Sequence, residues 1–151
     1  MRYFLDTEYN GFGGALLSLA LVPEDGGEEF YVTLACDDPI EPWVGKHVIP
    51  FLDMVPERLK GPRLARRDAA DALSHWLAHD SGPDIIADWP EDLAQLSMLL
   101  LVEPGKMVPV PPLTLRFHPL HGFSTAANSA VPHNALHDAR ALRDHMMTHL
   151  E

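Results

Sequence analysis

Phe4-Leu-Asp-Thr-Glu-Tyr-Asn-Gly11 places two carboxylates, those of Asp6 and Glu8, at the end of a short apolar run. Side chains alternate along a β-strand, so residues two apart point to the same face of a sheet. We therefore expect Asp6 and Glu8 to converge on one point. Like charges held close together repel each other, and a bound cation is the usual remedy. A strand that simply ends in a polar turn is the alternative.

Three apolar segments around this stretch indicate an antiparallel meander. Strands are expected over residues 2–6, 15–22 and 29–34. The sequence Pro23-Glu-Asp-Gly-Gly27 is a strong turn signal between the second and the third of them. Short connections of this kind join antiparallel neighbours.

The rest of the chain alternates helical and strand patterns. The expected elements are helices over 42–52, 66–79, 91–101 and 134–150, strands over 84–88 and 113–117, a proline-rich loop over 104–113 and an irregular segment over 118–132. The pattern predicts the α/β class, with a mixed sheet (an antiparallel three-stranded meander plus parallel strands) flanked by helices. We expect residues 1–151 to form a single domain.

Composition narrows the environment of the protein. The apolar fraction is 46%, and no apolar run approaches the roughly 20 residues that span a bilayer, so no membrane partner is expected. A signal-peptide pattern is also missing from the sequence. The single cysteine, Cys36, cannot form an intramolecular disulfide. These features predict a cytoplasmic location.

The net charge of −11 argues against a broad nucleic-acid-coating surface, which is normally basic. It permits an enzyme that holds a few nucleotides through metal ions, because the ions neutralise both the carboxylates and the substrate phosphates. One basic cluster is a candidate phosphate-contacting patch: Lys60, Arg63, Arg66 and Arg67. The solvated start of a helix would explain the same cluster equally well.

Two further segments carry candidate catalytic groups. Asp92 falls in the first turn of an expected helix, four residues after Asp88 at a strand end. His133 lies near the start of the last expected helix, and Asp138 follows about one turn later, so both can face one cleft. A histidine beside a carboxylate–metal cluster is a natural general base, because its ordinary pKa of about 6.5 is close to working pH. Taken singly, Asp92 could merely cap its helix and the last segment could be a polar surface helix.

In this order the three segments resemble the motifs of the DnaQ-like 3′–5′ exonucleases of the histidine-containing DEDDh subgroup. Asp6-x-Glu8-x-x-Gly11 is similar to their first motif, and residues 85–92 are similar to the second. His133-x-Ala-x-x-Asp138-Ala139 is similar to the third. The opening residues and the short length look most like the small ribonuclease AS-type exoribonucleases.

The resemblance implies a ribonuclease H-like fold and a two-metal-ion hydrolase. Asp6, Glu8, Asp92 and Asp138 would ligate two divalent ions, with Asp6 bridging them. Oxygen-only ligands suit Mg²⁺ or Mn²⁺ rather than zinc. His133 would take the proton from the attacking water.

The resemblance also implies a substrate. The family shortens single-stranded nucleic acid from its 3′ end and releases 5′-mononucleotides, and the likeness to exoribonucleases favours RNA, or a 3′ overhang, over DNA. Thr7 and Tyr9 would lie beside the terminal nucleotide, and Trp89 is a candidate for base stacking. Relatives in this family are commonly homodimers.

One position departs from the family. Asp88 stands where asparagine is common, so it could supplement Asp92 or replace it as a metal ligand. The helix-start placement favours Asp92.

Two other classes of protein compete with this interpretation. Histidine pairs spaced i, i+4 at 75/79, 133/137 and 145/149 could bind zinc, but the sequence has no His-Glu-x-x-His motif and Cys36 has no partner. A non-catalytic acidic interaction module on the same fold is the second alternative. The presence of every expected ligand disfavours it.

Overall fold

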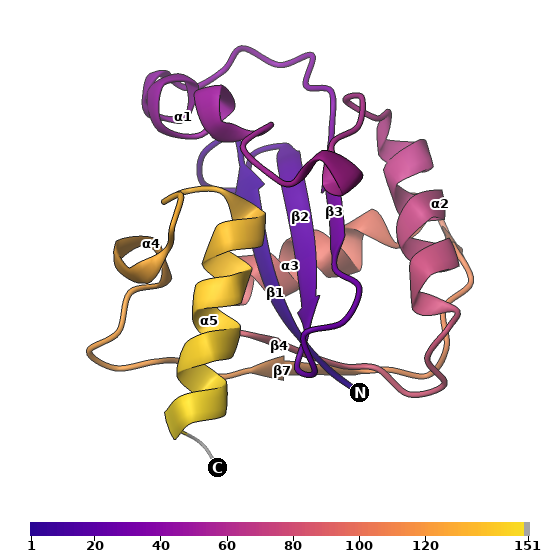
Figure 1. Cartoon of the computed structure of the whole chain (residues 1–151). Coiled ribbons are helices and arrows are strands. Elements are labelled where there is room, and N and C mark those ends of the chain that lie inside the picture. The colour runs from indigo at the N-terminus through magenta and orange to yellow at the C-terminus, as the bar shows by residue number, and fades with distance from the viewer. Residues whose placement is uncertain (150–151) are drawn as a thin grey trace.

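A five-stranded mixed sheet forms the centre of the structure, a computed structural model that describes residues 1–149 (Figure 1). Its order is β3-β2-β1-β4-β7. The strands are β1 (Arg2–Tyr9), β2 (Leu16–Pro23), β3 (Phe30–Thr33), β4 (Asp84–Ala87) and β7 (Thr114–Phe117). The first three strands pair antiparallel, whereas β4 runs parallel to β1 and β7 parallel to β4. The predicted α/β class and its mixed sheet are confirmed.

Helices cover both faces of this sheet. On one face, α2 (Arg66–Leu77) and α3 (Pro90–Leu99) share a buried apolar cluster with Tyr3 and Leu5 of β1. On the other face, α5 (Ala135–His149) packs Leu142 and Met146 against Phe4 and Ile86 (Figure 1). Strand β1 is therefore buried on both sides, which explains why its apolar residues are consecutive rather than alternating with polar ones.

The segment expected to be one helix over 42–52 is divided. Helix α1 ends at His47 (Pro42–His47), and a 3₁₀ turn, η1 (Ile49–Phe51), follows it. Pro50 gives the reason, because proline has no N–H to continue an α-helix and its ring clashes with the preceding turn. A second 3₁₀ turn, η2 (Glu57–Leu59), precedes α2.

Two other segments contain structure that the sequence pattern did not predict. Within the expected loop over 104–113, β6 (Lys106–Met107) pairs with β5 (Leu101–Glu103) through a Pro104-Gly105 turn. Gly105 has a φ of 73°, as a turn with proline and then glycine at its centre requires. The expected irregular segment over 118–132 contains one short helix, α4 (Thr125–Asn128), with the Ser124 hydroxyl as its N-cap.

The last helix begins one residue later than predicted, because Asn134 caps it. The Asn134 side-chain oxygen accepts hydrogen bonds from the N–H groups of Leu136 and His137. Its amide donates to the carbonyl of Phe51 at 2.8 Å, which ties the start of α5 to η1. The predicted C-terminal boundary at Leu150 lies outside the described residues. Within residues 1–149, no helix has the length and apolar character that would let it cross a bilayer.

Candidate metal centre

The end of β1 distributes its polar side chains to both faces of the sheet. Asp6 and Glu8 share the face of Phe4, which packs against α5, and Thr7 points to the opposite face. The strand continues through Tyr9, three residues beyond its predicted end, and a β-bulge follows Glu8. The two carboxylates are therefore held on a regular strand rather than in a mobile turn.

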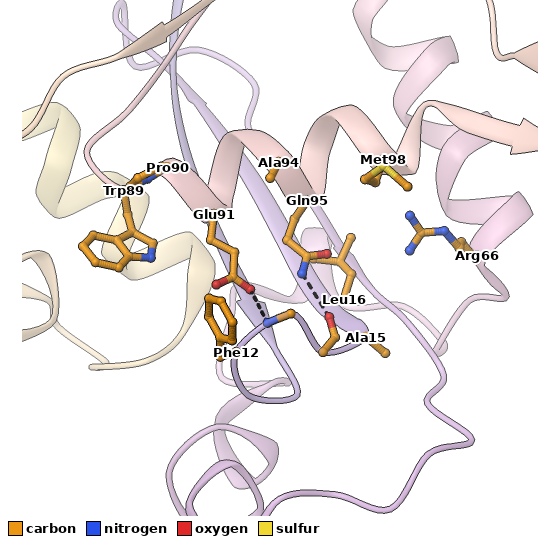
Figure 2. A pocket seen from close by; sticks show the side chains of 12 residues that line it. Phe12, Ala15, Leu16, Arg66, Trp89, Pro90, Glu91, Ala94, Gln95 and Met98 are labelled. Atoms are coloured by element: carbon orange, nitrogen blue, oxygen red, sulfur yellow. Dashed lines mark hydrogen bonds between the residues drawn. The ribbon is translucent and has the colours of Figure 1, made fainter.

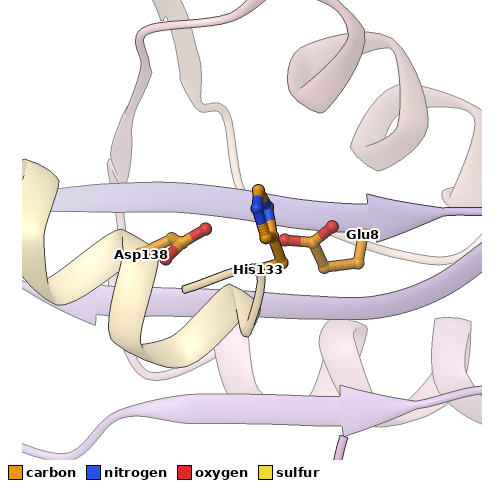
Figure 3. A group of neighbouring side chains, drawn as sticks. All are labelled: Glu8, His133 and Asp138. Carbon is orange, nitrogen blue, oxygen red and sulfur yellow. The ribbon is translucent and has the colours of Figure 1, made fainter. Parts of the chain in front are cut away.

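Glu8 meets two groups from the start of α5. The potential ligand atoms of Glu8, His133 and Asp138 all lie within 4.8 Å of one another, and Figure 3 shows the His133 ring between the two carboxyl groups. Among residues 1–149, this is the one group of three or more such side chains that meets this distance. His133 has a φ of 62°, a left-handed conformation that histidine adopts more readily than most residues. The turn before α5 thus folds His133 back over β1.

Asp92 approaches the site from the first turn of α3 and is fixed there by Thr7. Its Oδ1 accepts a hydrogen bond from the Thr7 backbone N–H at 3.1 Å and another from the Thr7 hydroxyl at 2.6 Å. Both donors of Thr7 are therefore engaged with Asp92. Thr7 also lines the adjacent cavity, and its predicted place beside the terminal nucleotide stays a prediction.

Two buried carboxylate oxygens of the cluster have no hydrogen-bond partner. They are Asp6 Oδ2 and Asp138 Oδ1. Asp138 and Asp92 are each only 3% exposed, and Asp6 is 8% exposed. Leaving such oxygens unpaired costs free energy, and native proteins rarely do so without a functional reason.

The electrostatics of the cluster show the same lack of compensation. Burial raises the pKa of Glu8 to about 8, and repulsion by Asp138 and Asp92 adds to the effect. The pKa of Asp92 rises to about 7 and that of Asp138 to about 6, in both cases mainly through burial. Asp6 is shifted well above its usual pKa by burial and by repulsion from the other carboxylates. Asp92 and Asp138 therefore lie close enough to Asp6 and Glu8 to raise the pKa values of both.

The donor set fits hard divalent cations. Carboxylate oxygens that are buried, partnerless and mutually repelling are the groups that Mg²⁺ or Mn²⁺ would stabilise. Asp6, Glu8, Asp92 and Asp138 could hold such ions, and His133 could either ligate one or remain free as a base. The histidine pairs considered for zinc do not meet a third ligand within residues 1–149. Both ring nitrogens of His79, for example, face other partners, the hydroxyl of Tyr3 and the carbonyl of Trp76.

His133 is packed by two rings that the sequence did not single out as its neighbours. The indole of Trp43 lies edge-on to it with ring centroids 5.0 Å apart, and the His47 ring is tilted against Trp43 with centroids 4.7 Å apart. Burial and the nearby His47 lower the pKa of His133, so its unprotonated form is favoured. His137 points elsewhere, because its Nε2 lies 2.8 Å from the carbonyl oxygen of Met54.

A cavity of about 450 Å³ opens beside Glu8, large enough for a nucleotide-sized ligand. Its lining includes Tyr9, Trp43 and Trp89. Trp89 is 59% exposed, so its ring is accessible to a ligand. Trp76 instead packs against Tyr3 and the apolar core.

The remaining predicted groups are placed as follows. Asp88 is half-buried, its pKa is raised by burial, and it lies near enough to contribute to the raised pKa of Asp6. Asp92 is more deeply buried than Asp88, and its hydrogen bonds with Thr7 fix its orientation. In the basic cluster, Arg63 pairs with Asp53, Arg67 with Asp71 and Lys60 with Glu57. These three cations are therefore neutralised within the chain.

Comparisons with known proteins add no assignment: no family model matches this chain, and no curated protein matches it. The function must therefore be argued from the chemistry of the site.

Proposed function

We propose that this protein is a metal-dependent 3′–5′ exonuclease of ribonuclease H-like fold that shortens single-stranded RNA, or a 3′ overhang, and releases 5′-mononucleotides. One observation carries the proposal. Four acids (Asp6, Glu8, Asp92 and Asp138) meet at the C-terminal end of the central strand β1 with no compensating cation among residues 1–149, and His133 lies against two of them. Divalent ions would supply the positive charge that this arrangement lacks, and they would also bind the phosphodiester of the substrate.

The roles of the residues follow from their positions. Asp6, Glu8, Asp92 and Asp138 would hold two Mg²⁺ or Mn²⁺ ions. When bound, such ions lower the pKa of a water molecule and stabilise the charge that develops on the phosphate and the leaving 3′-oxygen. His133 would accept the proton of the water that attacks phosphorus, as the bond to the 3′-oxygen breaks. Its lowered pKa keeps the imidazole in the form that can accept a proton.

Substrate placement follows from the cavity beside Glu8. The Tyr9 ring and the exposed face of Trp89 lie where a terminal base would stack. RNA is proposed ahead of DNA because the sequence motifs resemble those of exoribonucleases. A DNA-directed exonuclease would use the same acids. The same resemblance leads us to propose a homodimer, and the lone Cys36 is compatible with the cytoplasm.

The deciding experiment follows the products of end-labelled single-stranded RNA and DNA with Mg²⁺, Mn²⁺ or EDTA. We expect stepwise shortening from the 3′ end with metal only, and loss of at least about 10³-fold in rate for Asp6→Asn, because metal ions contribute several kcal/mol to such reactions. Asp37→Asn is the matched control, since it removes the same charge from an exposed site.

Two results would contradict the proposal. One is the absence of metal-dependent shortening of either nucleic acid. The other is an Asp6→Asn protein that cuts as fast as the Asp37→Asn protein. If in addition no Mn²⁺ binds, a non-catalytic acidic module becomes the better description.

A further inference from the structure

A second hollow continues from the cavity beside Glu8 along the outer side of α3. It has a volume of about 590 Å³, and the two share Phe12, Trp89 and Glu91 as lining residues. Figure 2 shows Phe12 and Trp89 at one end of this groove and Arg66, from α2, at the other. The groove therefore leads from the candidate metal centre toward a cationic side chain.

The walls of the groove are apolar and open to solvent. Phe12 is 99% exposed, Trp89 59% and Met98 56%, and the lining between them includes Ala15 and Ala94. Large apolar side chains grouped in this way on a surface usually mark a binding site. Flat π-faces beside a catalytic centre are the surfaces on which nucleic-acid bases stack without sequence preference.

The loop that presents Phe12 is held to α3 by two hydrogen bonds. The Glu91 carboxylate accepts from the Gly13 N–H at 3.0 Å, and Gln95 donates to the Gly14 carbonyl at 3.0 Å (Figure 2). Gly13 has a φ of 68°, which favours glycine at this turn. These contacts fix the loop backbone next to Phe12 beside the groove and engage the one carboxylate in its lining.

Arg66 is unusual among the cations of this acidic chain. Nine of the eleven Lys and Arg side chains form ion pairs, and within residues 1–149 the exceptions are Lys46 and Arg66. Lys46 is on α1, whereas Arg66 lines the groove. A guanidinium that is not neutralised within the protein can bind a phosphate.

The length of the groove sets how much substrate it can hold. Trp89 and Met98 are nine residues apart along α3, which corresponds to about 13 Å at the helical rise of about 1.5 Å per residue. Stacked nucleotides are spaced by about 3.4 Å, so the groove spans roughly four of them.

We propose that this groove binds the nucleotides upstream of the scissile bond in a single strand, with bases against Phe12 and Met98 and a phosphate at Arg66, while Trp89, which lines both hollows, marks the boundary with the terminal nucleotide. This inference rests on the proposed exonuclease function and adds a substrate-length preference to it. The other possible occupant, a second copy of the chain, is an outcome of the test below.

The test compares Arg66→Ala with Arg67→Ala, which removes the same charge from the same helical turn but takes it from an ion pair with Asp71. Binding of a fluorescent eight-nucleotide single strand is measured in the Asp6→Asn background over a range of salt concentrations. We expect Arg66→Ala to make the plot of log K against log salt less steep, by the amount that corresponds to the loss of about one phosphate contact. Arg67→Ala should leave the slope unchanged. Phe12→Ala should weaken binding roughly 5- to 150-fold through lost stacking.

Hydrolysis gives the second readout. For Arg66→Ala in the active protein, we expect KM to rise about tenfold for the eight-nucleotide substrate and to stay within about twofold for a dinucleotide. Equal behaviour of the Arg66 and Arg67 variants in both readouts would overturn the groove assignment and leave the exonuclease proposal intact. Arg66-dependent binding without any hydrolysis by the unaltered protein would support the groove as a binding site and contradict the exonuclease proposal. Loss of dimers in Phe12→Ala, with oligonucleotide affinity unchanged, would identify the groove as an interface between copies and overturn the inference.

Discussion

Buried carboxylates occur in two contrasting settings around α5. Glu29, just before β3, is 6% exposed. Its carboxylate accepts hydrogen bonds from Nε and Nη2 of Arg140, both at 2.6 Å, and from Nη2 of Arg58 at 2.8 Å. Burial acts to raise the pKa of Glu29, but the hydrogen bonds and charge of Arg140 with the charge of Arg58 lower it overall. At the end of β1, Asp6 and its neighbours have no guanidinium, and their pKa values rise.

The contrast shows that this fold can neutralise a buried acid when the sequence provides a basic partner. The acids at the end of β1 have no such basic partner among residues 1–149. Their charge and hydrogen-bonding capacity are therefore left for ligands from outside the chain. Unfavourable electrostatics of this kind are typical of functional sites, where stability is sacrificed for chemistry.

The largest expected effect concerns His133, the proposed general base at the acidic cluster. His133→Ala should lower kcat by about 10²–10⁴-fold, the usual contribution of a general base. Metal binding, measured by calorimetry with Mn²⁺, should be largely retained because the carboxylates remain. His137→Ala is the matched control, since His137 contacts the Met54 carbonyl instead. Equal rates for the two variants would remove His133 from the proposed mechanism.

The next effect concerns the ion pairs that neutralise Glu29. Glu29→Gln leaves Arg140 and Arg58 without their carboxylate and should destabilise the protein by about 2 kcal/mol, less than a fully buried pair because both guanidiniums reach solvent. For a chain of this length the melting temperature should fall by about 4–8 °C. Activity per folded molecule should not change. A melting temperature equal to that of the unaltered protein would show that the ion network contributes little.

A smaller effect concerns the orientation of Asp92. Thr7→Val removes the hydroxyl that donates to Asp92 Oδ1 and keeps the shape of the side chain, whereas Thr7→Ser keeps the hydroxyl. Partners that orient a metal ligand typically contribute 10- to 100-fold in metal affinity or activity. We therefore expect the valine variant to lose about that factor and the serine variant to lose much less. Equal losses in both would indicate a packing effect of the side chain rather than its hydrogen bond.

The last prediction concerns the pH dependence of stability, which has opposite signs at the acidic cluster and at Glu29. The pKa values of Glu8 and Asp92, about 8 and 7, lie above their unfolded values near 4, so these groups stabilise the metal-free fold at low pH and that contribution is lost as pH rises through the folded pKa values. Glu29, with a lowered pKa, contributes stability above its unfolded pKa that is lost as pH falls.

Scanning calorimetry in EDTA would measure this dependence. Between pH 5 and 8 the melting temperature should fall, and Mn²⁺ should reverse the fall at pH 8. Glu8→Gln should make the metal-free curve flatter. A melting temperature that rises over this range in EDTA would show that the cluster does not carry uncompensated charge.

Local sequence patterns anticipated most of the fold. The strands and the three long helices follow from apolar periodicity. The spacing of Asp6 and Glu8 predicted that they converge, whereas Asp92 and Asp138 were assigned to the site through the resemblance to the exonuclease motifs. The division of the helix after His47 was missed although Pro50 marks it, and the β5–β6 hairpin was missed although Pro104-Gly105 is a turn signal. The 3₁₀ turn after α1 and the two strands of the hairpin are each only two or three residues long, too few for a periodic pattern to stand out.

The sequence by itself determined that Asp6 and Glu8 share a face, because side-chain alternation in a strand is a local property of the backbone. Only the tertiary structure decided which groups meet them. The capped start of α5 and the left-handed turn at His133 bring that ring between Glu8 and Asp138, and the parallel pairing of β4 with β1 sets α3 so that Asp92 reaches Thr7. The tertiary structure also leaves Arg66 without an ion pair among residues 1–149, whereas the nearby Arg63 and Arg67 pair with Asp53 and Asp71. Long-range contacts of this kind depend on how distant elements pack, which no local pattern records.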